Sequence, residues 1–506
     1  MAELPKKKGY NVKRQMVRGS IWAIALRWSV RLTGLVSTVI LARLLTPRDY
    51  GIVAIASLIV GSVEVFTRTG QYAAIIRHPN PTREHYDSAW TVSLLLGLGL
   101  GLIIWALVPL TTAYFHEPQA RPVVQVLALR TMMLGTQNIG CAVNIQRYLQ
   151  FRKQFLFNAV PTLVSFVVTV TGAFIFRNYW ALVIGILSQH VTTVSLSYII
   201  EPFRPRIGFS KVREIWSFSI WSLFKGLGLY VNNQVENVAI GGFAGAPAMG
   251  RYSVACDVAI SPSQELINPM VSVLLPVMAK VQDDKEKRRE LYLNVLYWSA
   301  LICTSTGVGV ALVSQDMADL VLGAKWHDVG VLMPWFALSY AVLGLSSSVY
   351  SAFDTLGRAF ISARLQWMRV IVLAAAVFPV AYMTHSLEAV VITRFIVTIL
   401  VTPTLFYALS RVLEVPVRDF AITMWRPIAA SAIMAAVVLA ANMGITFTGT
   451  PRLALDMVLG GVSYAAALML LWLSNGRPPG PEHIAWDRAG ALLARLRRLQ
   501  APSKIS

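Results

Sequence analysis

The chain has 506 residues, of which 56% are apolar and only 14% are charged, and its formal net charge is +20. Because a typical soluble domain carries about 25% charged residues, this composition excludes an ordinary soluble protein. In a soluble protein the basic excess would favour nucleic-acid binding. Here most basic residues lie outside the apolar segments, so membrane topology explains them better.

Long apolar segments run almost back to back through the chain. A helix needs about 20 apolar residues to cross a bilayer, and fourteen segments of about that length follow one another with connections too short for a soluble domain. The sequence therefore predicts an all-α polytopic membrane protein. The predicted spans are residues 18–44, 50–70, 88–110, 121–143, 155–176, 179–199, 215–243, 250–278, 292–313, 329–352, 365–384, 387–409, 422–443 and 453–474.

Basic residues are distributed unequally between the two sides of the membrane. With a cytoplasmic N-terminus, 32 of the 45 lysines and arginines fall on the cytoplasmic side and seven on the opposite side. Since cytoplasmic connections carry the excess of basic residues, we expect both termini in the cytoplasm. The basic N-terminus leads directly into the first span, so we expect no cleavable signal peptide.

Two short motifs recur about 200 residues apart. The tripeptide Ser-Ile-Trp occupies residues 20–22 and 219–221, and the turns at 47–51 and 247–252 each place a proline a few residues before an aromatic residue and a glycine. Six spans separate the copies, so both halves enter the membrane from the same side, as in transporters built from parallel repeats. The predicted organisation is a basic N-terminus (1–17), an N-lobe (18–210), a C-lobe (211–411), two further helices (412–475) and a cytoplasmic amphipathic tail (476–506).

Ionisable side chains inside the spans indicate a polar interior, since such groups are costly in hydrocarbon unless they face water or a partner. Arg27 and Arg31 share one helix face, and Lys225 lies near the matching position of the second half. One interpretation is a water-filled cavity for an anion, because guanidinium groups match phosphate oxygens bidentately. The alternative is structural pairing, of these arginines with Glu64 or of Glu64 with Arg68.

The candidate site residues belong to two groups. The predicted substrate-binding residues are Arg27, Arg31, Lys225, Asn232, Arg130 and Arg394. The predicted residues for a coupling ion, H⁺ or Na⁺, are Asp257, Glu236 and Glu64.

Several kinds of active site have no signal in this sequence. There is no phosphate-binding G-x-x-x-x-G-K-[ST] loop, and all three cysteines lie in apolar spans, where buried packing is their usual role. The seven histidines lie mostly in connections and are not spaced like metal ligands. We therefore expect no cofactor, no metal and no enzymatic activity.

Four segments carry a resemblance to a known family. They are LARLLTPRDYG (41–51), GQYAAIIR (70–77), GRYSVA (250–255) and PVMAKVQDD (276–284). Their order and spacing resemble the Wzx-type lipid-linked oligosaccharide flippases of the multidrug/oligosaccharidyl-lipid/polysaccharide exporter superfamily, and most of all the branch similar to colanic-acid exporters. The resemblance covers residues 15–475, and it transfers no site residue by signature.

The resemblance implies a V-shaped pair of six-helix lobes around a central cavity, flanked by two C-terminal helices. It implies alternating access that moves an undecaprenyl-pyrophosphate-linked oligosaccharide from the cytoplasmic to the periplasmic leaflet of a bacterial inner membrane, for exopolysaccharide or lipopolysaccharide synthesis. The partners it implies are this lipid, the bilayer, a polysaccharide polymerase and export machinery, with no nucleic acid.

Two other functions remain open from the sequence. A drug or metabolite antiporter of the same superfamily would normally have twelve spans and an acid-dominated cavity. A membrane polysaccharide polymerase or ligase would need a large periplasmic loop carrying arginine or histidine, and this sequence has no such loop.

Overall fold

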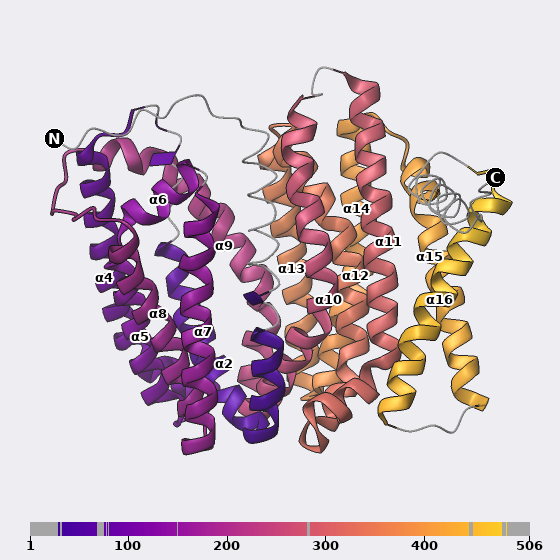
Figure 1. The fold of residues 1–506 in the computed structure, drawn as a ribbon, viewed down its shortest axis with the longest axis horizontal. Helices are drawn as coiled ribbons and strands as arrows, with labels where there is room; N and C mark the ends of the chain where they lie inside the picture. Colours follow the sequence, from indigo (N-terminus) through magenta and orange to yellow (C-terminus); the bar gives the residue numbers. More distant parts are fainter. Residues whose placement is uncertain are drawn as a thin grey trace, which may run out of the picture. The chain divides into compact units, whose positions relative to one another are not determined.

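The computed structural model describes residues 29–30, 33–67, 75–76, 78, 80–148, 150–280, 284–444, 449–477 and 482, with backbone only for 215–225, 268–280 and 359. Within these residues the chain forms helices and no strand (Figure 1). It divides into two compact units, residues 1–253 and 254–506.

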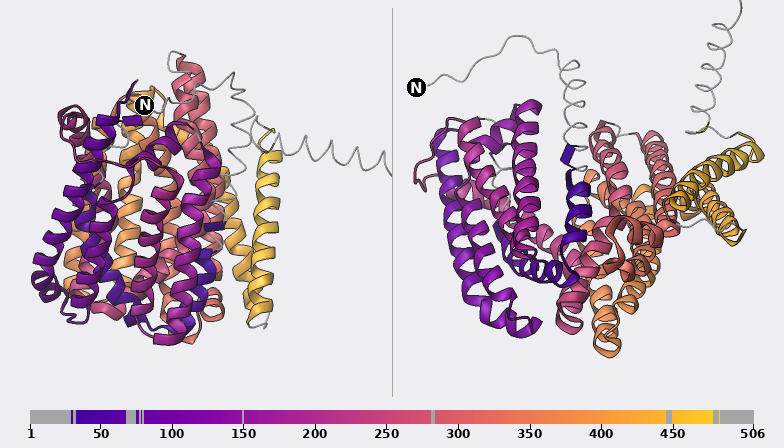
Figure 2. Two further views of the ribbon diagram at one scale, coloured as in Figure 1. Left: turned by 60° about the vertical axis from the view of Figure 1, so that its left-hand side comes forward. Right: turned by 60° about the horizontal axis from the view of Figure 1, so that its bottom comes forward.

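Each unit is a bundle of long helices that run side by side (Figures 1 and 2). Unit 1 contains α2 (Pro47–Glu64), η1 (Val65–Thr67), α4 (Arg83–Phe115), α5 (Ala120–Gly135), α6 (Ile139–Arg147), α7 (Phe151–Phe176), α8 (Trp180–Ile200), α9 (Val212–Phe243) and the start of α10 (Gly245–Lys280). Unit 2 contains the rest of α10, α11 (Lys285–Met317), η2 (Ala318–Leu322), η3 (Ala324–Trp326), α12 (His327–Thr355), α13 (Ala359–Thr384), α14 (Leu387–Leu413), α15 (Val417–Gly444) and α16 (Thr450–Ser474).

The prediction of an all-helical membrane protein is confirmed. Ten of the described helices are long and apolar enough to cross a membrane. Large apolar side chains project outward from them, with Leu102 62% exposed on α4 and Leu400 68% exposed on α14. Since backbone polar groups are satisfied within helices, such outer faces suit hydrocarbon. Every predicted span from the second onward coincides with a described helix or helix pair, whereas most of the first lies outside the described residues.

The fourth predicted span, 121–143, is wrong as a single helix, because the chain breaks between α5 and α6. Asn138 begins α6, and its Oδ1 accepts a hydrogen bond from the Gly140 N–H at 3.0 Å. Its Nδ2 donates to the carbonyl oxygens of Glu201 and Phe203, at 3.1 and 2.9 Å. Asparagine competes with the helical backbone for hydrogen bonds, so one buried amide both interrupts the span and attaches it to the chain after α8.

The repeated turns contact each other through their glycines. A Cβ on Gly51 would lie 1.7 Å from the carbonyl oxygen of Ala246, and one on Gly250 would lie 1.8 Å from that of Pro47. Gly250 follows Gly51 by 199 residues, and Ala246 follows Pro47 by the same number. The two contacts are therefore reciprocal, as expected where two copies of a repeat meet about a pseudo-twofold axis. Only glycine permits backbones to approach this closely.

Small residues also bring α5 against its neighbour α4. A Cβ on Gly97 would lie 2.8 Å from the Cα of Gly135, and one on Gly101 would lie 2.5 Å from the Met132 side chain. Small residues at this spacing let membrane helices pack closely where no hydrophobic force drives association. This packing fixes the position of the α5 segment that carries Arg130.

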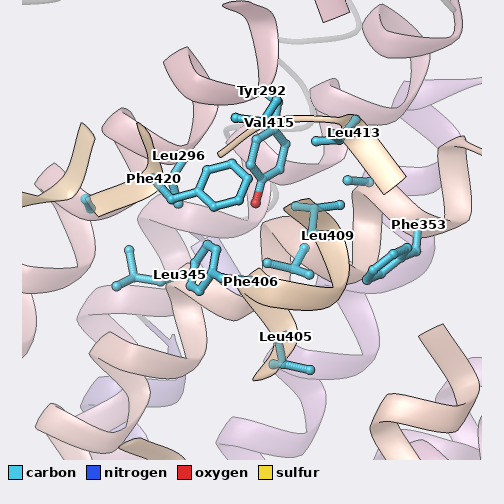
Figure 3. Close-up of a cluster of buried hydrophobic side chains, with 13 residues drawn as sticks. Tyr292, Leu296, Leu345, Phe353, Leu405, Phe406, Leu409, Leu413, Val415 and Phe420 are labelled. Carbon is cyan, nitrogen blue, oxygen red and sulfur yellow. The ribbon is translucent and has the colours of Figure 1, made fainter. Parts of the chain in front are cut away.

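Unit 2 is built around a buried aromatic and aliphatic cluster (Figure 3). The ring of Phe420, from α15, lies 5.8 Å from that of Tyr292 on α11 and 5.6 Å from that of Phe406 on α14. Ring centroids at these separations are typical of favourable aromatic pairs. The two C-terminal helices also bind α11 through polar contacts, since Ser431 donates to Thr304 at 2.9 Å and Tyr464 to the Leu301 carbonyl at 3.0 Å.

The two compact units divide within α10, after residue 253, whereas the lobes expected from the repeat divide at residue 211. Helix α9 packs in unit 1, where the Tyr230 hydroxyl donates to the Leu58 carbonyl on α2 at 2.8 Å. The two compact units are defined by packing, whereas the two lobes are defined by the sequence repeat. The division into units therefore does not test the lobe boundaries, which stay a prediction.

The reciprocal glycine contact predicts a steep cost for any side chain there. Replacing Gly250 by alanine should destabilise the protein by about 1–3 kcal/mol, the usual range for overpacking, because the new Cβ would meet a backbone oxygen that cannot rotate away. Thermal unfolding of the purified protein in detergent measures the effect.

Gly309→Ala is the matched control, since a Cβ at this α11 position would meet nothing within 4 Å. It should stabilise the helix by about 0.5–1 kcal/mol, the advantage of alanine over glycine within a helix. An unfolding temperature of Gly250→Ala at or above that of the unmodified protein would contradict the close backbone contact.

Candidate functional site

Three of the predicted substrate-binding side chains cannot be placed. Arg27 and Arg31 lie outside the described residues, and for Lys225 only the backbone is described. Their assignment to an anion-binding cavity stays a prediction. The other six predicted side chains are described, and they divide between the two units.

In unit 1 the structure brings together two predicted residues, Glu64 and Arg130, that are 66 positions apart. Arg130 Nη2 lies 2.7 Å from Glu64 Oε2, and the Thr131 hydroxyl donates to Glu64 Oε1 at 3.0 Å. Glu64 ends α2, and Arg130 and Thr131 lie on consecutive positions of α5. Glu64 pairs with Arg130, and the Arg68 of the alternative interpretation lies outside the described residues.

The two partners of this ion pair differ in exposure, since Glu64 is nearly buried and Arg130 is partly exposed. The Glu64 side chain is 10% exposed and the Arg130 side chain 25% exposed. The guanidinium Nε of Arg130 is buried and has no hydrogen-bond acceptor among the described residues. An arginine carries five N–H donors, so Arg130 has donors left for a second anion.

Such a site can exchange one anion for another at Arg130. A phosphate oxygen that approached Arg130 would compete with Glu64 for a bidentate, charge-assisted contact. The displaced Glu64 carboxylate would then be a buried charge without its partner, which is costly. Exchange at this pair therefore requires a cation that compensates Glu64.

In unit 2, Arg394 is packed on aromatic rings. It lies on α14 and is only 4% exposed, with its guanidinium carbon 4.9 Å from the Tyr340 ring centroid and 5.9 Å from that of Phe336. Both rings belong to α12, and a guanidinium over an aromatic face is a favourable cation–π arrangement. These contacts stabilise a buried cation within the helix packing.

The polar residues of α9 and α10 differ in exposure. Asn232 is half-buried and donates to the side-chain oxygen of Asn233 at 3.3 Å. Glu236 is fully buried, whereas Asp257 is exposed. The three residues therefore occupy different environments, and their assignments to substrate and coupling ion stay predictions.

A second ion pair, in unit 2, has no counterpart in the sequence analysis. Arg426 Nη1 lies 2.9 Å from Glu482 Oε1, with side chains 9% and 3% exposed. The Tyr297 hydroxyl donates to the same carboxylate oxygen, and the Arg426 guanidinium lies 5.1 Å from the Tyr297 ring. These contacts join α11 and α15 to the segment after α16, which indicates a structural role.

The sequence analysis identified both ends of the Glu64–Arg130 pair but missed Thr131, Tyr340 and Phe336. Thr131 had a usable signal, since it directly follows a charged residue inside a span. Tyr340 and Phe336 had none, because an aromatic residue in an apolar span is ordinary and only the packing of α12 against α14 puts them beneath Arg394.

Solved structures share this fold. The lipid II flippase MurJ in an inward closed conformation has a TM-score of 0.71 at 12% sequence identity, over 90% of this chain and 99% of MurJ. An inward-facing MATE family multidrug resistance transporter of the MOP superfamily has a TM-score of 0.59 at 14% identity, over 77% of this chain and 98% of the transporter. The architecture is therefore the MurJ/MATE fold, of which the described residues show ten helices able to span a membrane.

Curated relatives are similar in sequence over about two thirds or more of their length. The lipopolysaccharide biosynthesis protein WzxC of Escherichia coli K12 is 24% identical over 67% of this chain and 69% of its own. The succinoglycan biosynthesis transport protein ExoT of Rhizobium meliloti is 22% identical over 73% of this chain and 74% of its own. The colanic-acid-exporter-like branch stays a prediction, because none of these similarities assigns a branch.

The family itself follows from a match that covers more than half of the chain. The sequence model described as "Polysaccharide biosynthesis protein" matches residues 40–330. Together with the shared fold, this match identifies a transporter rather than an enzyme. The chain belongs to the polysaccharide biosynthesis protein family, which comprises the Wzx-type flippases of the MOP superfamily.

Proposed function

We propose that this protein is a flippase for a lipid-linked oligosaccharide. It moves an undecaprenyl-pyrophosphate-linked oligosaccharide from the cytoplasmic to the periplasmic leaflet of a bacterial inner membrane by alternating access. The product serves exopolysaccharide or lipopolysaccharide synthesis, where a polysaccharide polymerase and export machinery take over the lipid-linked unit.

The names of related proteins support this function. One relative is a lipopolysaccharide biosynthesis protein and another a succinoglycan biosynthesis transport protein, while the MurJ structure is that of a lipid II flippase. These proteins share the problem of handling a glycan whose polar, charged head cannot enter hydrocarbon unaided.

The Glu64–Arg130 pair is the observation on which the proposal depends. A partly open guanidinium inside the bundle offers a pyrophosphate the bidentate contact that water would otherwise supply. Binding displaces the Glu64 carboxylate, which is then available to the coupling ion, H⁺ or Na⁺, so phosphate and ion enter the site together.

The remaining candidates keep the roles that the sequence predicts for them. We propose that further cationic and amide side chains hold the pyrophosphate and the first sugars, and that two more carboxylates respond to the coupling ion. The substrate set is Arg27, Arg31, Lys225, Asn232 and Arg394, and the ion set is Glu236 and Asp257.

A null strain tests the function directly. In a strain that lacks this gene, lipid-linked repeat units should accumulate in the cytoplasmic leaflet, inaccessible to a membrane-impermeant glycan-labelling reagent added to spheroplasts. A plasmid copy of the gene should restore labelling. If this copy is fused at its C-terminus to green fluorescent protein, which fluoresces only in the cytoplasm, its fluorescence tests the predicted cytoplasmic C-terminus. Normal delivery of repeat units in the null strain would contradict the flippase proposal and favour the antiporter.

Neutralising the two charges separately and together tests the site. Arg130→Gln alone should destabilise the protein by about 3–5 kcal/mol, because it leaves a buried carboxylate without a partner. Adding Glu64→Gln should recover stability but not export, which should stay at least about tenfold below normal because no guanidinium holds the pyrophosphate. Unfolding temperature and the delivery assay are measured on the same variants.

The second buried ion pair provides a matched control. Arg426→Gln combined with Glu482→Gln removes a pair of similar geometry that has no proposed contact with substrate, so export should stay within about twofold of normal. Normal export by the folded Arg130→Gln/Glu64→Gln protein would remove this pair from the site, and an equal loss in both double variants would show that the loss is not specific.

A further inference from the structure

Three potential metal ligands, distant in sequence, converge at one end of unit 1. His78 lies between α2 and α4, His85 in the first turn of α4 and Glu214 in the first turn of α9. One ligand atom from each lies within 4.8 Å of the other two. Among the described residues this is the one group of three or more histidine, cysteine, aspartate or glutamate side chains with such a geometry.

The distances within the cluster are close to those of a metal site. His85 Nε2 lies 3.2 Å from Glu214 Oε2, and the rings of His78 and His85 are 4.5 Å apart at an interplanar angle of 45°. Two ligands of a tetrahedral zinc ion, at about 2.1 Å from the metal, lie roughly 3.4 Å apart. The three ligand atoms lie within 4.8 Å of one another. To enclose a zinc ion they would therefore have to approach each other by at most about 1.4 Å.

The orientation of the His85 ring is fixed by contacts at both nitrogens. Its Nδ1 accepts a hydrogen bond from the Thr82 backbone N–H at 3.1 Å and lies 2.8 Å from the Thr82 hydroxyl, while its Nε2 lies 3.2 Å from Glu214 Oε2. Because Nδ1 accepts, Nε2 carries the ring proton and donates it to Glu214. A metal ion at Nε2 requires this proton to move to Nδ1, where the Thr82 hydroxyl can accept it. A metal-bound histidine usually donates its other N–H to an oxygen in this manner, which fixes the ring and the tautomer.

His78 supplies an otherwise unexplained polar atom. Its Nδ1 is buried and has no hydrogen-bond partner among the described residues, although buried polar atoms normally have one. The backbone of His78 is held in place, because Arg147 Nη1 donates to the carbonyl oxygens of Ile75 and His78 at 3.2 and 2.9 Å. A metal ion would give this nitrogen a partner at that position.

The third ligand is anchored and accessible. Lys211 Nζ donates to Glu214 Oε1 at 2.7 Å, which holds the carboxylate in place with its Oε2 toward His85. The Lys211 backbone N–H donates to the Ser88 hydroxyl on α4 at 3.1 Å, which ties the start of α9 to α4. Glu214 is half exposed, with 51% of its side chain accessible, so an ion and a water ligand can reach the cluster.

We propose that His78, His85 and Glu214 bind one divalent transition-metal ion, with zinc as the best fit. Two imidazole nitrogens and one carboxylate are a common three-ligand set for zinc, with water in the fourth position. Calcium and magnesium prefer all-oxygen ligands, so the two histidines select against them. The bound ion would join the segment before α4 to the first turns of α4 and α9, and so fix one end of the unit 1 bundle.

Cobalt substitution tests this site on the full-length protein, purified in detergent through a tag without histidine and stripped with a chelator. One Co²⁺ per chain should bind and give the intense visible absorption of four-coordinate geometry, and one equivalent of Zn²⁺ should abolish that absorption. His78→Ala and Glu214→Gln should each weaken binding more than about 100-fold, since even outer-shell partners contribute 10–100-fold. Thr82→Val should weaken it about tenfold through the lost Nδ1 contact.

His116→Asn is the matched control. His116 adopts a left-handed backbone conformation with φ 50°, which asparagine also tolerates, and it lies outside the cluster, so this variant should bind Co²⁺ normally. Equal binding by His78→Ala, Glu214→Gln and His116→Asn would show surface binding only and overturn the proposal, as would the absence of a four-coordinate spectrum. Because His85 also supports the start of α4, the test relies on the other two ligands, with circular dichroism to confirm folding.

Discussion

The high cost of an isolated charge in hydrocarbon governs this structure. Three charges buried in the helices have specific partners: Glu64 holds Arg130, Glu482 holds Arg426, and Arg394 lies over the Tyr340 ring. A buried ion pair contributes little net stability but is strongly disruptive when one partner is lost. A competing anion can therefore replace Glu64 at the partly exposed Arg130, whereas a structural pair such as Arg426–Glu482 resists exchange because both side chains are almost fully enclosed.

The fold could largely be read from the sequence, because the length and apolar character of each span are properties of single segments. The break at Asn138 could not, since it depends on carbonyl groups after α8 that only the folded chain brings near. For the site, the sequence indicated Glu64 and Arg130 as unusual but not as partners, because 66 residues separate them. The convergence of His78, His85 and Glu214 was invisible, since no local spacing links the starts of α4 and α9 to one cluster.

The repeat gives the proposed transport a physical basis. The turns around Gly51 and Gly250 contact each other reciprocally at positions 199 residues apart, so the two copies of the motif meet at a close backbone contact. Small residues let membrane helices approach this closely. In a family whose relatives include a succinoglycan transport protein, a contact between the two copies of the repeat is compatible with the proposed alternating access.

Transfer of a defined lipid in a purified system tests the central claim most directly. The protein is reconstituted into vesicles that contain a fluorescent polyprenyl-pyrophosphate oligosaccharide in both leaflets, and a membrane-impermeant quencher is added outside. The account predicts that the protein lets the quencher reach nearly all of the lipid, and that vesicles with the Arg130→Gln/Glu64→Gln protein stop at the outer half. Equal quenching in vesicles with the normal protein, with this variant and with no protein would contradict it.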